Sequence, residues 1–153
     1  MDSLDFFNKT IREIITNENY QKMKKIPHHG NVSCYEHSYN VALYSYIFVI
    51  KNKWKVDLKS LIRGAMLHDY YLYDWHKKNG QKRWHGFRHP KIAYKNAKND
   101  FEINKKEKDI ITKHMWPLTL FLLPKYKESF IVMYADKMVS LNERYLVLMK
   151  SNA

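Results

Sequence analysis

Apolar residues recur at helical spacing along most of the chain. Phe7, Ile11 and Ile14 share one face of residues 4–17, and a second apolar face begins at Val41 and continues through Phe48. This period of three to four residues predicts amphipathic helices. The same pattern predicts further helices ending near the apolar run 61–67, over about 90–100, from about 104 through 114, and over about 127–149.

Polar residues at the expected helix starts support these boundaries. Ser33 with Glu36, and Asn104 with Glu107, have the spacing of capping boxes, and Asp57 is a candidate N-cap. Only four Gly and four Pro interrupt 153 residues, which favours helices over many short strands. We therefore expect an all-α protein, one domain over residues 1–153 built as a bundle of about six helices.

The segment 70–88 is aromatic and basic, with glycines at 80 and 86, and we expect a long ordered loop there. Loops of that length are often functional. Pro90 lies in the tolerated first turn of the helix predicted to follow it.

Several polar residues fall on apolar helix faces. His68 and Asp69 end the buried run 61–67, where a desolvated carboxylate is costly unless a cation or hydrogen bonds compensate it. Four more residues lie at helical spacing from apolar neighbours on other predicted helices: His37, His89, His114 and Asp136. Helical bundles build metal sites from such inward-pointing side chains on facing helices.

Neutral imidazole and carboxylate ligands suit iron, manganese, zinc, cobalt or nickel without selecting one of them. Six ligands exceed what one ion with an open position usually takes, so we expect two ions with Asp69 as the bridging ligand. Such a pair lowers the pKa of bound water and clamps a phosphoryl group during in-line attack. His85 lies four residues before His89 and is an alternative ligand in its place.

The order His37, His68-Asp69, Asp136 resembles the HD-domain superfamily of metal-dependent phosphohydrolases, over roughly residues 33–143. Two further histidines between the HD pair and the last Asp are typical of its binuclear members, and His89 and His114 occupy those places. The Gly-Lys that often follows the HD pair is replaced here by Tyr70-Tyr71. The Gly-Tyr-Pro signature of cyclic-dinucleotide phosphodiesterases is absent, which argues against cyclic di-GMP hydrolysis.

The resemblance implies a phosphohydrolase that cleaves a phosphate ester or anhydride, of a nucleotide or another small phosphorylated metabolite, with metal-activated water. It implies two divalent transition-metal ions, with iron or manganese expected ahead of zinc, cobalt or nickel. We assign catalytic roles to Asp69, as bridging ligand and proton acceptor, and to Lys137 beside Asp136. A di-iron oxygenase on the same scaffold remains an alternative.

The chain has 27 Lys and Arg against 15 Asp and Glu, a formal charge of +12. The electric field of this positive charge attracts anions, which suits a small phosphorylated substrate. A non-enzymatic module that binds nucleic acid is therefore a further alternative. Nucleic-acid binding is not favoured, because the lysines are scattered along the chain rather than clustered. The predicted substrate contacts lie in or at the end of the aromatic loop: Lys77, Lys78, Lys82, Arg83 and Arg88.

The remaining expectations concern location. A single cysteine, Cys34, fits a reducing compartment, and the acidic N-terminus lacks the pattern of a signal peptide. The longest apolar stretch, 41–50, is about half the length needed to cross a bilayer. We therefore expect a cytoplasmic protein without a membrane partner, and its oligomeric state stays open.

Overall fold

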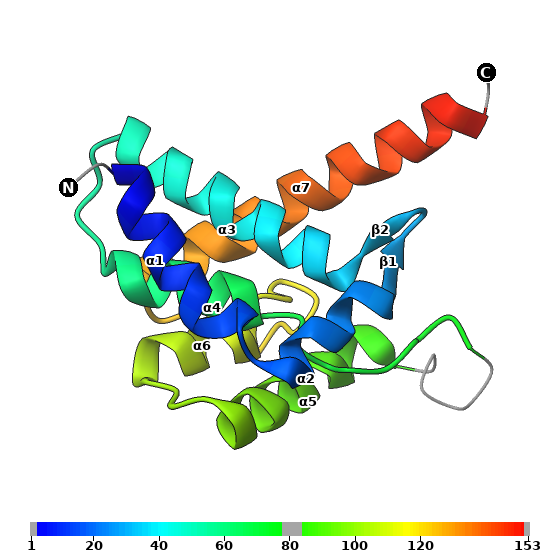
Figure 1. The fold of residues 1–153 in the computed structure, drawn as a ribbon, viewed down its shortest axis with the longest axis horizontal. Coiled ribbons are helices and arrows are strands. Elements are labelled where there is room, and N and C mark those ends of the chain that lie inside the picture. The colour runs from blue at the N-terminus through cyan, green and yellow to red at the C-terminus, as the bar shows by residue number, and fades with distance from the viewer. Residues whose placement is uncertain (1–2, 78–83, 152–153) are drawn as a thin grey trace.

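The computed structural model describes residues 3–77 and 84–151 and is a bundle of helices with one small hairpin (Figure 1). The all-α prediction is confirmed. These two ranges contain seven α-helices rather than about six, and the shortest of them, α2, has four residues. In chain order the elements are α1 (Ser3–Ile15), α2 (Glu18–Gln21), the 3-10 helix η1 (Lys22–Lys25), β1 (Pro27–His29), β2 (Val32–Ser33), α3 (Cys34–Lys51), α4 (Leu58–Leu67), α5 (His85–Asp100), α6 (Lys105–Lys113) and α7 (Lys127–Ser151).

Helix α4 forms the centre of the bundle. It contacts α1, α3, α5, α6 and α7, and every residue from 60 to 67 is buried. A helix that is buried all round belongs to the core, which explains why residues 61–67 form an almost continuous apolar run. Gly64 permits the close approach of α6, because a Cβ at that position would lie 3.0 Å from the Cβ of Ile110.

The predicted helix caps are present. The Ser33 hydroxyl accepts from the Glu36 backbone N–H, and the Glu36 carboxylate accepts from the Ser33 N–H in return. Asn104 and Glu107 form a second capping box at α6. The Asp57 carboxylate accepts from the backbone N–H of Ser60 at the start of α4. These caps fix the directions in which α3, α4 and α6 enter the core.

Helix α5 begins five residues earlier than the predicted start at Pro90. The backbone N–H groups of Phe87 and Arg88 both donate to the Trp84 carbonyl at 3.0 Å, so the helix is already formed before Pro90. The prediction that Pro90 opens the helix was wrong, because a proline inside the first turns removes one hydrogen bond without preventing an earlier start. His85 and His89 therefore share one face of a single helix.

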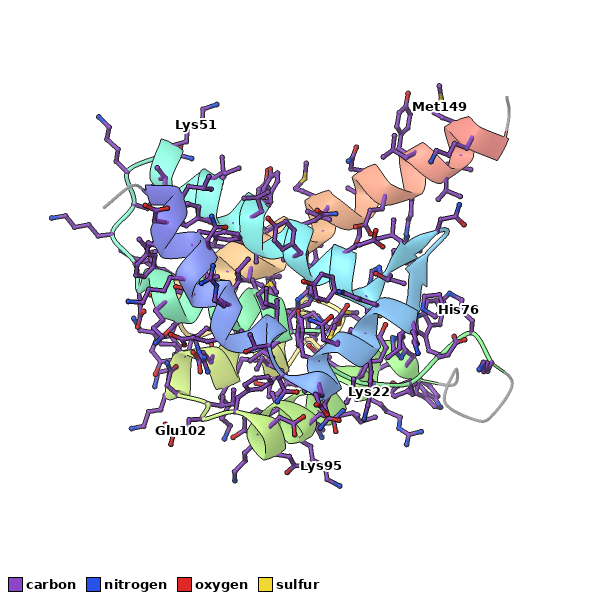
Figure 2. All side chains as sticks on the ribbon, viewed as in Figure 1. Lys22, Lys51, His76, Lys95, Glu102 and Met149 are labelled. Carbon is purple, nitrogen blue, oxygen red and sulfur yellow. The ribbon has the colours of Figure 1, made fainter. Side chains whose placement is uncertain are left out.

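The surface charge is spread over the molecule. Figure 2 shows Lys51 and Lys95 pointing outward from opposite edges of the bundle, and Lys22 is exposed as well. The far end of α7 extends beyond the neighbouring helices at the upper right of Figure 1. Among residues 3–77 and 84–151, no helix combines the length and the hydrophobicity needed to span a bilayer.

Candidate metal centre

Two of the candidate ligands follow directly after the ends of helices. His68 is the C-cap of α4 and His114 is the C-cap of α6. The Nδ1 of His68 lies 2.6 Å from the carbonyl of Ala65, and the Nδ1 of His114 lies 2.9 Å from the carbonyl of Ile111. The last turn of a helix has carbonyls without an intrahelical partner, and histidine there can donate to them. A carbonyl only accepts, so each Nδ1 carries a proton, and each Nε2 offers a lone pair when its ring is neutral.

His89 is oriented in the same way within α5, because its Nδ1 donates to the carbonyl of His85 at 2.9 Å. Its Nε2 lies 2.8 Å from the Nε2 of His114. Both nitrogens are acceptors when each ring is neutral with its proton on Nδ1, and two facing lone pairs at this distance repel each other. A cation between or beside them removes this repulsion. Ligating histidines characteristically donate their other ring N–H to a carbonyl or carboxylate, as these do.

His37, in the first turns of α3, is held between two carboxylates of α7. Its Nδ1 lies 3.0 and 3.2 Å from the two carboxylate oxygens of Glu143, and its Nε2 lies 3.0 Å from Oδ1 of Asp136. The Oδ1 of Asp136 is also 3.7 Å from the Nε2 of His68. His37, His68 and Asp136 thus form one compact group of three buried or nearly buried potential ligands.

Asp69 lies between this group and the pair His89 and His114. Its Oδ1 is 3.1 Å from the Nε2 of His89 and 3.5 Å from the Nε2 of His114. Its Oδ2 is 3.5 Å from the Nε2 of His68 and 3.9 Å from that of His37. The two oxygens of one carboxylate therefore face two different groups of imidazoles.

The electrostatics of the centre are those of a cation site. Burial raises the pKa of Asp69 and of Asp136, but the surrounding histidines outweigh it and hold both pKa values well below the usual range. Burial lowers the pKa of His37 and of His68, yet the facing carboxylates raise both to about 9. Within the described residues, the Nε2 of His68 and Oδ1 of Asp69 have no hydrogen-bond partner although both are buried. A buried carboxylate oxygen such as Oδ1 of Asp69 is costly unless a cation compensates it, so the donor set fits a divalent metal.

His28 and Glu143 also belong to the centre. The Nε2 of His28, on β1, lies 3.2 Å from Oδ2 of Asp69, and its ring stacks on that of His37 at 3.7 Å. Glu143 was not predicted, although its position gave a signal: it follows Asp136 by seven residues, which is two helical turns on the same face. From the sequence, the doublet His28-His29 was expected only as a pair that could reach the site, and the hairpin places His28 there.

His85 lies beside the centre. Its Nδ1 is 2.8 Å from the Tyr73 hydroxyl, and its ring stacks between Trp75 and His89. Burial and the neighbouring His89 lower the pKa of His85 to about 4, so the ring is neutral near pH 7. Because the Nε2 of His89 faces Asp69 directly, the geometry favours His89 over His85 as the ligand on α5.

A cavity of about 740 Å³ opens onto the ligands. Asp69, His89, His114 and Asp136 line it on one side, and Trp75, Met115, Leu118 and Leu141 form apolar walls. Two cations line it as well, Lys137 and Arg144. The Nζ of Lys137 donates to the carbonyl of His114 at 3.3 Å, and burial lowers the pKa of its ammonium group.

The predicted substrate contacts lie elsewhere. Lys77 and Arg88 are exposed and are not among the residues that line this cavity. Lys78, Lys82 and Arg83 lie outside the described residues. The contacts of all five residues with a substrate therefore stay a prediction, while Lys137 and Arg144 are the cations that line the cavity with the ligands.

The comparisons with known proteins agree with this geometry. The sequence profile described as HD domain matches residues 34–140, well over half of the chain. That segment contains all six predicted ligands, from His37 to Asp136. No curated protein and no solved structure matches the chain. The protein therefore belongs to the HD domain family, whose members bind divalent metals and are usually metal-dependent hydrolases.

Proposed function

We propose that this protein is a metal-dependent phosphohydrolase that cleaves a phosphate ester or anhydride of a small molecule, such as a nucleotide. One observation carries the proposal: the Nε2 atoms of His89 and His114 face each other at 2.8 Å while each Nδ1 donates to a backbone carbonyl. This arrangement is stable when a cation accepts both lone pairs. Membership of the HD family makes metal-dependent hydrolysis the chemistry to expect of such a site.

The ligand set divides into two groups that share Asp69. His37 and His68, which both contact Asp136, face Oδ2 of Asp69, and His89 with His114 face Oδ1. This division supports two ions, iron or manganese in the first place, with Asp69 as the bridging ligand. A metal pair in such a site lowers the pKa of bound water and stabilises the charge that develops on the phosphoryl group.

The residues of the chain supply binding and orientation. Lys137 and Arg144 line the cavity together with Asp136 and offer cations to a phosphoryl oxygen. The Nε2 of His28 lies 3.2 Å from Oδ2 of Asp69 and limits the rotation of that carboxylate. Trp75 adds an apolar side chain to the cavity wall. A volume of about 740 Å³ is within the usual range for small-molecule sites.

The dependence on oxygen and on the metal separates this proposal from the di-iron oxygenase alternative. A cavity that opens onto the ligands and is lined by Lys137 and Arg144 is suited to a substrate with a phosphate. An oxygenase would consume oxygen with an iron-loaded site, and a phosphohydrolase would also be active with manganese under anaerobic conditions. Binding of nucleic acid is not favoured, because the lysines are scattered along the chain, and Lys51 and Lys95 lie at opposite edges of the molecule (Figure 2).

The test is a phosphate-release assay with protein stripped of metal and reloaded with manganese or iron, over a panel of nucleotides, sugar phosphates and p-nitrophenyl phosphate. We expect hydrolysis that depends on the metal and is lost in Asp69→Asn. Asp74→Asn is the matched control, since Asp74 pairs with His76 outside the centre. If no metal supports phosphate release, or if Asp69→Asn retains the activity, the proposal is refuted.

A further inference from the structure

The loop between α6 and α7 carries exposed apolar side chains at the edge of the cavity. The exposed apolar residues of this loop are Leu118, Leu120, Phe121, Leu122 and Leu123. Leu118 also lines the cavity. Phe121 is 96% exposed, so its ring contributes almost nothing to the core. A cluster of large apolar side chains in water is unfavourable and marks an interaction surface in most proteins.

Helix α7 continues this apolar surface. Phe130, Tyr134, Leu141 and Tyr145 are exposed and follow one another at intervals of four, seven and four residues, which places them on one face of the helix. The two parts are joined: Leu118 and Leu141 line the same cavity, and the ring of Trp116 lies 6.4 Å from that of Phe130. We call this surface the apolar rim: Leu118, Leu120–Leu123, Phe130, Tyr134, Leu141 and Tyr145.

The apolar rim has exposed basic neighbours. Lys125, Lys127 and Arg144 are exposed beside it along the chain, and residues 115–127 contain no Asp or Glu. The nearby carboxylates are buried or nearly buried and engaged with other groups: Asp109 with Lys113 and Ser129, Glu128 with Lys106, and Asp136 and Glu143 with the histidines of the metal centre. The surface around the rim is therefore both apolar and positively charged.

We propose that the apolar rim docks on the surface of an anionic lipid membrane. Apolar side chains flanked by Lys and Arg are what binding at a lipid interface requires: the apolar groups enter the headgroup region and the cations meet anionic lipids. A second copy of the chain fits less well, because each copy has a formal charge of +12 and the two would repel. The docking is peripheral and differs from the expectation of no membrane partner, which rested on the lack of a spanning segment.

The test is sedimentation of the full chain with vesicles of phosphatidylcholine alone and of phosphatidylcholine mixed with phosphatidylglycerol. We expect binding to the mixed vesicles only, weakening as salt screens the charges. Phe121→Asp should weaken this binding by about tenfold or more, a difference of about 1.4 kcal/mol. Because Phe121 is almost fully exposed, the variant keeps its fold. Leu4→Asp is the matched control: Leu4 is 52% exposed on α1, and its substitution should leave binding unchanged.

Three results would overturn the proposal. The first is an absence of binding to the mixed vesicles at low salt. The second is equal binding by Phe121→Asp and the unmodified chain. The third is sedimentation equilibrium showing a dimer that Phe121→Asp converts to a monomer, since a second copy would then cover the apolar rim. None of these measurements depends on metal or on hydrolysis, so docking and the proposed activity fail or succeed separately.

Discussion

Replacing Glu143 by glutamine should weaken metal binding although Glu143 itself need not touch the metal. Both of its oxygens lie within 3.2 Å of the Nδ1 of His37, and the residue is 5% exposed, so solvent screens its charge little. Burial raises the pKa of Glu143, but His28 and His37 lower it to about 2, so the group is a carboxylate near pH 7. It fixes the ring of His37 and makes its Nε2 more basic.

The magnitude follows from two opposed effects. Losing a carboxylate that orients a ligating histidine typically costs 10–100-fold in metal affinity. The same carboxylate helps to raise the pKa of His37 to about 9, so a proton competes with the metal near pH 7. Glutamine relieves part of that competition. We therefore expect the lower end of the range near pH 7, about tenfold or 1.4 kcal/mol.

Titration of metal-stripped protein with Mn²⁺, by calorimetry or by competition with a chelating indicator, measures this effect. Glu107→Gln is the matched control, because Glu107 is similarly buried but pairs with Arg63 rather than with a histidine. Glutamine at this position preserves the capping box of α6. Glu107→Gln should lower the free energy of unfolding and leave metal affinity unchanged. Affinity within twofold of the unmodified protein for Glu143→Gln, or an equal loss in both variants, would refute the reasoning.

Three further predictions concern stability, each checked by denaturant unfolding of the metal-free protein. Gly64→Ala should destabilise by about 1 kcal/mol, because overpacking against Ile110 outweighs the gain in helix propensity; a stabilised variant would contradict this. Ser33→Ala should lower the free energy of unfolding by about 1 kcal/mol, because it removes the hydroxyl that accepts from the Glu36 N–H. An unchanged free energy of unfolding would show that this cap does not stabilise the protein. Burial raises the pKa of Asp109, but its partners lower it on balance, so its stabilisation is complete above the unfolded pKa of about 3.9 and is lost as pH falls through the lower folded pKa. The loss of unfolding free energy caused by Asp109→Asn should therefore be largest near pH 6 and become smaller in acid. A loss that does not change with pH would exclude the charge of Asp109 as its cause.

The features predicted best from the sequence are those that residues close together in the chain determine. Ser33 and Glu36 are three residues apart, and their capping box is present because both partners lie in the same first turn. The six predicted ligands were found because each is a polar residue on an otherwise apolar face. The structure brings these six together, although their role as ligands stays a prediction.

Contacts between distant segments were harder to predict. The hairpin brings His28 to Asp69, and helix packing brings Glu143 to a histidine 106 residues away in the chain. Arg88 is exposed on α5, which begins at His85 rather than at Pro90. Such features depend on which faces meet after packing, and periodicity contains no information about that.

The anchoring of the histidines suggests how the centre and the fold depend on each other. His68, His89 and His114 each donate to a carbonyl three or four residues earlier, so their orientation survives wherever their own helix is formed. His37 is different, because its Nδ1 partner is on α7 and its orientation requires α3 and α7 to be packed. A metal that binds the folded state stabilises it according to its concentration and affinity. Metal binding should therefore strengthen the α3–α7 contact above all, and the apolar rim on α7 depends on that same contact for its position beside the cavity.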